Sequence, residues 1–166
     1  LKAGSGIGTS GTPIKTSVSS LQAINTTSGD ISITNTGTLT LTNLDGSKDV
    51  SDEYVAIGNN GTGNVSITTV GATADIIVQG VDASNGAMVE ANGDISLIAG
   101  RDVKSDASSI GDIYTGSGDV LLQAGQDIAF YYWVESAKAT DGQITLTAVG
   151  DIGVGMINFL DAEDNP

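Results

Sequence analysis

One short phrase recurs along the chain and limits the folds open to it more than any other feature. It reads glycine, then Asp, Asn or Gln, then Ile or Val, then any residue, then Ile or Leu. Its five copies begin at Gly29, Gly63, Gly93, Gly118 and Gly142, with glycines 34, 30, 25 and 24 residues apart. Self-similarity at such a period indicates a repeat architecture, in which each unit buries its apolar face against the next.

A second phrase follows the first in the later copies. It reads Leu, any residue, Ala, any two residues, Asp or Gly, then Ile or Val, and it covers residues 97–103, 122–128 and 146–152. The chain also opens on it, at residues 1–7. Its alanines are Ala3, Ala99, Ala124 and Ala148. We expect these alanines to form one inward-facing ladder, placed where each unit turns a corner.

Both phrases alternate apolar and polar residues over short runs, and glycine-containing turns separate the runs. This alternation is typical of short β-strands. A period of 24–34 residues is too long for a hairpin and too short for a propeller blade of about 40 residues. It fits one coil of a three-sided parallel β-helix. We therefore predict one all-β domain over residues 1–166, a single parallel β-helix (β-solenoid) with about 24–34 residues per coil.

The composition excludes several kinds of chemistry and several partners. The chain has no cysteine and no histidine, which removes disulfides, thiol nucleophiles, and the usual general base and transition-metal ligand. Twenty acidic residues against six basic ones give a net charge of −14, which repels phosphate backbones. Because no apolar run approaches the roughly 20 residues of a membrane span, we predict neither nucleic-acid binding nor membrane insertion.

Residues 93–103 (GDISLIAGRDV) and 118–128 (GDVLLQAGQDI) resemble the haemagglutinin-type repeats of giant secreted bacterial adhesins and surface fibres, the filamentous haemagglutinin class. Residues 6–21 resemble segments of giant repetitive surface proteins. The resemblance covers most of the chain. It implies a right-handed parallel β-helix that forms the fibrous shaft of an exported protein, and an extracellular or cell-surface location.

The two ends of the chain match each other at an offset of 145 residues. The matched pairs are Leu1 with Leu146, Ala3 with Ala148, and Ile7 with Ile152. We expect these six residues to mark assembly ends, in about one unit of a tandem array or in a subunit that stacks on identical neighbours. The alternative is a coincidence within a degenerate β-helix pattern. The acidic residues at 161–164 are expected to act as a gatekeeper against unwanted pairing.

Acidic residues recur at two turn positions, and stacked coils would bring their like charges together. Asp30, Asp94 and Asp119 follow the glycine of the first phrase, and Asp102, Asp127 and Asp151 precede the last residue of the second phrase. At about 5 Å in water the repulsion is roughly 0.8 kcal/mol per pair. Such stacks persist if the carboxylates accept turn N–H bonds or hold a cation. Asn64 and Gln143 replace the aspartate in two copies, which favours hydrogen bonding. A calcium ladder on Asp94, Asp119, Asp102, Asp127 and Asp151 is the alternative.

Four aromatic residues stand together at 130–133. With Ile128 inward, alternation places Phe130 and Tyr132 in the core and Tyr131 and Trp133 on the surface, unless a corner intervenes. An exposed Tyr131–Trp133 pair can bind a sugar ring or a partner chain. The alternative is that the rings fill a wide coil or cover a loop.

Together these features favour a structural segment or subunit of an extracellular fibre, whose partners are identical or homologous units stacked end to end. The main alternative is an adhesin region that binds a cell-surface glycan or protein. A polysaccharide lyase or hydrolase is the third possibility, with Arg101 and Lys104 as its weak candidates for a base. Because the carboxylates fall at repeated positions rather than in one singular cluster, we predict no enzymatic activity. We predict no cofactor either, with calcium as the alternative.

Overall fold

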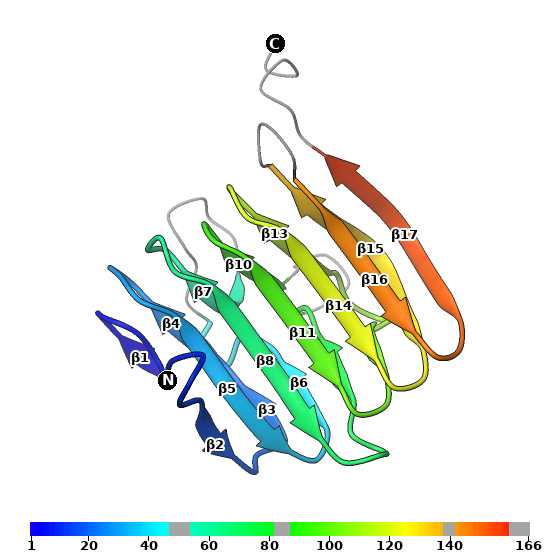
Figure 1. Ribbon diagram of the computed structural model, residues 1–166. Coiled ribbons are helices and arrows are strands. Elements are labelled where there is room, and N and C mark those ends of the chain that lie inside the picture. Colours follow the sequence, from blue (N-terminus) through cyan, green and yellow to red (C-terminus); the bar gives the residue numbers. More distant parts are fainter. Residues whose placement is uncertain (47–53, 82–86, 138–141, 160–166) are drawn as a thin grey trace.

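The computed structural model describes residues 1–46, 54–81, 87–137 and 142–159, and within these ranges it contains 17 strands and no helix (Figure 1). All the pairings between these strands are parallel. No strand pairs with its neighbour in sequence. Each pairs instead with strands one repeat earlier or later, so the coils lie side by side from the N-terminal to the C-terminal end (Figure 1).

The strands fall into three columns, which the chain visits in the order A, B, C. Column A is the 6-stranded sheet of β2 (Ile14–Thr16), β5 (Ile31–Thr36), β8 (Val65–Val70), β11 (Ile95–Ala99), β14 (Val120–Ala124) and β16 (Ile144–Ala148). Column B contains β3 (Ser20–Leu21), β6 (Leu39–Leu41), β9 (Ile76–Val78), β12 (Val103–Ser105) and the first parts of β15 (Ile128–Ser136) and β17 (Ile152–Phe159). Column C contains β1 (Lys2–Ala3), β4 (Ala23–Asn25), β7 (Val55–Asn59), β10 (Ala87–Ala91), β13 (Gly111–Thr115) and the second parts of β15 and β17.

Strand β15 joins columns B and C into one 11-stranded sheet. Its Ile128 pairs with Val103 of β12, whereas its Val134 pairs with Ile113 of β13. Its pairing with β17 shifts register between Phe130 and Trp133. The corner that separates the two columns in earlier coils is thus reduced to an irregularity inside a single strand.

The strand register confirms the repeat that the two phrases predict. The third residue of the first phrase, an Ile or Val, stacks from coil to coil in column A. The stacked residues are Ile31, Val65, Ile95, Val120 and Ile144. Ala99, Ala124 and Ala148 are also register partners and lie at the end of their column A strands. Most of the variation in period lies between columns B and C, where the number of residues between register positions falls from 18 (Leu39 to Ile57) to 5 (Ile152 to Ile157).

The prediction that Ala3 belongs to the same ladder as Ala99, Ala124 and Ala148 is wrong. Ala3 pairs with Asn25 in column C and is not part of the Ala99 ladder. Ile7 bridges to Ile31 in column A, so it occupies the position of Ile144 rather than that of Ile152. The opening residues turn the corner from C to A, whereas the second phrase turns the corner from A to B. The same spacing of apolar and small residues thus occurs at two different corners, which explains the misleading match.

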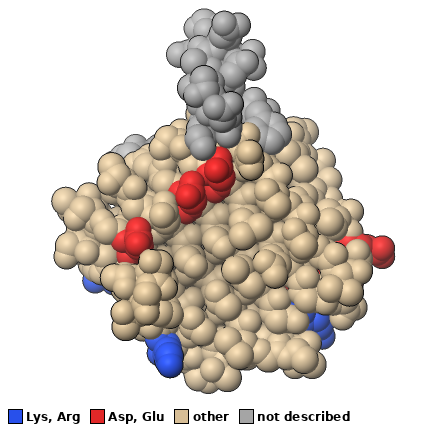
Figure 2. All heavy atoms as spheres, in the orientation of Figure 1, with Lys and Arg blue, Asp and Glu red and all other residues tan. Residues whose placement is uncertain are grey.

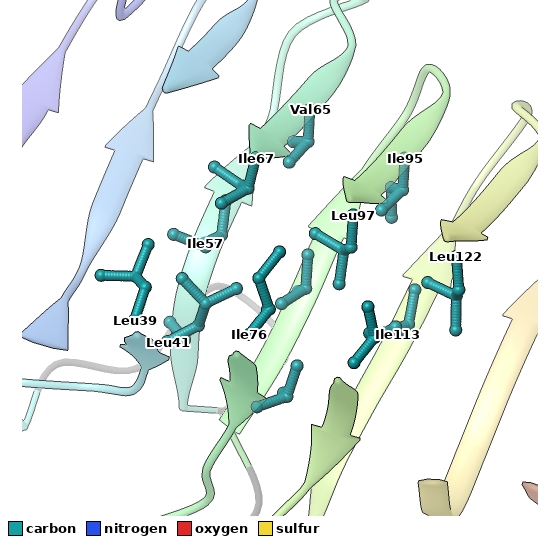
Figure 3. Close-up of a cluster of buried hydrophobic side chains, with 14 of the residues drawn as sticks. Leu39, Leu41, Ile57, Val65, Ile67, Ile76, Ile95, Leu97, Ile113 and Leu122 are labelled. Carbon is teal, nitrogen blue, oxygen red and sulfur yellow. The ribbon is translucent and has the colours of Figure 1, made fainter. Parts of the chain in front are cut away.

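The core lies between the columns and consists of stacked aliphatic side chains (Figure 3). Ile67, Leu97 and Leu122 of column A face Ile76 and other residues of columns B and C, and all are fully buried. Burying one such side chain contributes about 1.5–3 kcal/mol. Among the described residues, every buried side-chain nitrogen or oxygen has a hydrogen-bond partner.

The phrase glycines stack directly on one another at the start of column A. A Cβ atom on Gly118 would lie 2.3 Å from the carbonyl oxygen of Gly93, and one on Gly63 would lie 2.0 Å from the carbonyl oxygen of Gly29. No side chain fits so close to backbone atoms. The glycine of the repeat is therefore required because successive coils approach each other through their main chains.

The expected acidic gatekeeper at residues 161–164 lies outside the described residues. No helix long and apolar enough to cross a membrane occurs in the part of the chain that the structure describes.

Candidate functional site

The C-terminal edge of the stack, formed by β16 and β17, exposes the interior of the fold. Ile152 and Ile157 are 48% and 46% exposed, although their register partners Ile128 and Val134 are 1% and 0% exposed. Leu146 in β16 is likewise only partly buried. No described strand pairs with β16 or β17 on the side away from β14 and β15. Within the described ranges, this edge therefore combines backbone groups that have no strand partner with uncovered apolar side chains.

The N-terminal edge consists of β1, β2 and β3. Leu1 and Ile14 are exposed there, whereas Ile7 and Leu21 are buried. This edge is thus covered better than the C-terminal one.

The structure divides the six predicted assembly residues between the two edges. Leu1, Ala3 and Ile7 lie in the first coil, and Leu146, Ala148 and Ile152 lie in the last. Within one chain the two groups are separated by all the intervening coils (Figure 1). A contact between them requires another unit.

The first aspartate ladder is a chain of side-chain to main-chain hydrogen bonds between coils. Each side-chain oxygen accepts the N–H of the next member: Asp30 Oδ1 from Asn64 (3.0 Å), Asn64 Oδ1 from Asp94 (2.8 Å), Asp94 Oδ1 from Asp119 (2.9 Å), and Asp119 Oδ1 from Gln143 (3.0 Å). An Asn fits this role as well as an Asp because only one acceptor oxygen is needed. The ladder therefore works as a set of clamps between neighbouring coils.

The second ladder has the same geometry at the corner from A to B. Asp102 Oδ1 accepts the N–H of Asp127 at 3.3 Å, and Asp127 Oδ1 accepts that of Asp151 at 2.9 Å. Among the described residues no three acidic side chains are grouped closely enough to hold a metal ion. The geometry favours the hydrogen-bonding interpretation of both ladders, and calcium binding stays a prediction.

On the face drawn in Figure 2 the charged side chains are few and unevenly placed. Figure 2 shows acidic side chains in a short oblique row across one face, with basic side chains toward the margin of the same view. Most of this face carries no charge. The outward positions of column A are mainly hydroxyl and amide residues, such as Ser66, Thr68 and Gln123.

A buried ion cluster around Asp75 was not foreseen from the sequence. Asp75 is 2% exposed and accepts hydrogen bonds from Arg101 Nε to Oδ1 at 2.6 Å and from Arg101 Nη2 to Oδ2 at 2.5 Å. Lys104 Nζ lies 2.8 Å from the same Oδ2. Burial alone would raise the pKa of Asp75, but the hydrogen bonds from Arg101 and Lys104 outweigh it and lower the pKa from its ordinary 3.8 to about 2.

This cluster explains why Arg101 and Lys104 flank a strand start. Lys104 Nζ also lies 3.2 Å from Asp102 Oδ2, and although burial opposes it, the hydrogen bonds to both carboxylates raise the pKa of Lys104. A lysine held protonated in this way is a poor general base. A sequence signal for the cluster did exist, because Asp75 precedes Ile76 just as Asp102 precedes Val103 one coil later.

Two buried asparagines at the corner from C to A were also missed. Asn25 Nδ2 donates to Asn59 Oδ1 at 2.9 Å, and Asn25 Oδ1 accepts the N–H of Gly6 at 2.9 Å. Asn59 Nδ2 donates to the carbonyl of Gly29 at 3.0 Å. The signal is that both asparagines stand four residues before a phrase glycine. They satisfy the backbone where the chain turns and add polar contacts between coils.

The aromatic run lies at the reduced corner of β15. As predicted, Phe130 is buried while Tyr131 and Trp133 are 59% and 41% exposed. Tyr132 is only half-buried, because the corner interrupts the alternation. The Trp133 N–H donates to Asp112 Oδ1 at 3.2 Å, which fixes the backbone but leaves the indole ring on the surface.

Comparison of the chain with protein-family models, with curated proteins and with solved structures finds no match in any of the three. What the geometry defines is an all-β protein of parallel, solenoid-like stacked coils, with clamped corners and an open C-terminal edge.

Proposed function

We propose that this chain is a structural segment or subunit of an extracellular fibre, folded as a single right-handed parallel β-helix of the filamentous haemagglutinin type. Units stack head to tail so that the coils continue from one to the next. The observation that carries the proposal is the open C-terminal edge, where inward-facing Ile152 and Ile157 are half-exposed although every column could continue past them.

The mechanism of such a shaft is mechanical. Main-chain hydrogen bonds between parallel strands run along the stack, and the aspartate clamps reinforce them at two corners. Each coil contacts only its neighbours, so load passes from coil to coil through many small interactions. The net charge of −14 keeps neighbouring fibres soluble and apart.

The extracellular or cell-surface location follows from the resemblance of residues 93–103 and 118–128 to adhesin repeats. The partners are identical or homologous units, joined covalently in a tandem array or by non-covalent stacking. The proposal includes no enzymatic activity and no obligatory cofactor. Turnover of an acidic polysaccharide, or a melting temperature that falls when calcium is chelated, would contradict that part of it.

Electron microscopy of the native material tests the proposal. We expect unbranched filaments one solenoid wide. Dispersed particles at every concentration would contradict it. An intact mass of the native protein then separates the two ways of joining units, because a mass of 16.6 kDa indicates non-covalent stacking and a much larger mass indicates a tandem array.

A second candidate function is adhesion to a cell-surface glycan or protein. The observation in its favour is the exposure of Tyr131 and Trp133, which lie two positions apart in β15. Aromatic faces on a surface are suited to stacking against sugar rings. If this function holds, Trp133→Ala abolishes binding to a glycan array, and its circular dichroism spectrum stays that of the wild type. Thr145→Ala, a change on the outer face of column A, is the control and leaves binding intact.

A further inference from the structure

We propose that the outer face of column C binds the ammonium group of a lysine side chain of a partner protein, between the carboxylate of Asp112 and the indole ring of Trp133. Asp112 lies in β13 and Trp133 in the neighbouring β15 (Figure 1). The inference rests on the second candidate function, adhesion, and names the chemistry of the partner. This face lies on the side of the stack, so it stays accessible when units stack end to end.

Asp112 and Trp133 are neighbours on one surface. In β13 Ile113 is buried in the core, so the preceding Asp112 points outward. In β15 Val134 is buried, which directs Trp133 outward in the same way. Because Val134 pairs with Ile113, Trp133 stands beside Asp112 on the adjacent strand, with about 5 Å between the two chains. A cation held by the carboxylate can therefore lie within the roughly 6 Å over which an aromatic ring attracts it.

The charge of Asp112 is not neutralised within the described part of the chain, where no basic side chain forms an ion pair with it. Burial raises the pKa of Asp112, the hydrogen bond from the Trp133 N–H opposes this rise, and the negative charge of Glu135 adds to it. Asp75, by contrast, is held by Arg101. A half-buried carboxylate without such a partner gains from a cation supplied by another molecule.

The arrangement around Asp112 suits an ammonium group on a flexible stem. Its Oδ1 accepts the Trp133 N–H at 3.2 Å. Among the described residues Oδ2 has no hydrogen-bond partner, and because every buried side-chain oxygen there has one, Oδ2 is open to solvent. One open oxygen matches the compact ammonium of lysine, whereas the planar guanidinium of arginine is best matched by two.

The surroundings of the site favour a protein segment over an amino sugar. The register partner of Trp133 is Met156, and the two side chains are 41% and 46% exposed. The methylene stem of a lysine can pack on this apolar surface while its ammonium group reaches Asp112. An amino sugar carries its ammonium group directly on a rigid ring and has no such stem. The net charge of −14 attracts basic segments in general, and the local pair gives the attraction one place.

Fluorescence titration tests the inference, because Trp133 is the single tryptophan of the chain and reports on its own surroundings. The probe is a tetralysine peptide with blocked ends. The matched control peptide is its Nε-acetylated form, which carries no charge. At about 0.15 M salt, which screens general attraction between exposed charges, we expect a saturable change in fluorescence with the first peptide and none with the second.

Two variants that each remove one negative charge separate the site from the net charge. Asp112→Asn keeps an acceptor for the Trp133 N–H and is expected to weaken binding about tenfold. Asp30→Asn, on the first aspartate ladder, is the control and should leave binding within about twofold. Trp133→Leu, followed with a labelled peptide, should weaken binding about threefold or more.

The outcomes distinguish this inference from adhesion itself. Equal weakening by Asp112→Asn and Asp30→Asn, an equal response to the acetylated peptide, or tighter binding of a glucosamine oligosaccharide would each overturn the lysine site. No response to tetralysine would also overturn it, and adhesion stands if binding to a glycan array still depends on Trp133. Failure to bind both the peptide and the array would overturn both.

Discussion

At the scale of single residues, Asp75 shows how a buried charge is accommodated in a fold made largely of aliphatic side chains. Arg101 and Lys104 reach it from the next coil and neutralise it. Because the pKa of Asp75 is lower in the folded state than in the unfolded chain, the ion cluster stabilises the fold above about pH 4, and this contribution is lost as the pH falls toward 2.

Asp75→Asn is therefore expected to lower the free energy of unfolding by about 2 kcal/mol at pH 7, which corresponds to the shift in pKa. Urea denaturation at pH 7 and at pH 2.5 or so measures the difference between variant and wild type, which should shrink at the lower pH. Asp151→Asn, at an exposed position of the last coil, is the control and should change stability by less than about 0.5 kcal/mol. A pH-independent loss for Asp75→Asn would contradict the ion-pair explanation.

Gly118 tests a different constraint, the contact between the backbones of successive coils. A Cβ at this position meets the backbone of Gly93 at 2.3 Å, and backbone atoms cannot rotate away. Gly118→Ala should thus destabilise the fold by about 2 kcal/mol or more. Gly153→Ala, where a Cβ meets nothing within 4 Å, should be neutral or slightly stabilising. Thermal denaturation of the two variants makes the comparison, and equal melting temperatures would argue against the stacked glycines.

At the scale of elements, the aspartate ladders connect strands that are far apart in sequence. If Asp94 acts as a hydrogen-bond acceptor for the Asp119 N–H, Asp94→Asn keeps the bond and should preserve stability, as the natural Asn64 does one coil earlier. Asp94→Ala should lose about 1 kcal/mol. Chemical denaturation with and without calcium checks this. Loss of stability in both variants, restored in the wild type alone by calcium, would favour a cation ladder instead.

The elements also show which parts of the fold the sequence predicts and which it does not. Alternation and the glycine phrase predict the column A strands and the Ala99–Ala124 register, because both depend on local spacing that repeats in every coil. The position of Ala3 was predicted wrongly because corners of similar composition occur at two different places in each coil.

Asp75 and Asn25 were missed for another reason. Their roles depend on partners one coil away, Arg101 in the first case and Asn59 in the second. Such contacts follow from the register of the whole stack rather than from any local pattern. The exposure of Tyr131 and Trp133, by contrast, was predicted from alternation alone, and only Tyr132 departs from it at the corner.

At the scale of the whole molecule, the interior coils differ from the last one. Interior coils are covered on both sides, whereas the last coil leaves Ile152 and Ile157 half-exposed. A second unit that packs against the last coil removes this exposure. A charge placed inside the open edge should prevent this, as inward-pointing lysines do on natural edge strands.

Sedimentation velocity over a range of concentrations tests the central claim most directly. The wild-type chain is expected to form an open series of multiples of 16.6 kDa that lengthens with concentration. Leu146→Lys should remain a folded 16.6 kDa monomer, because its ammonium group would have to be buried at the contact. A wild-type chain that sediments as a single 16.6 kDa species at every concentration would contradict the account.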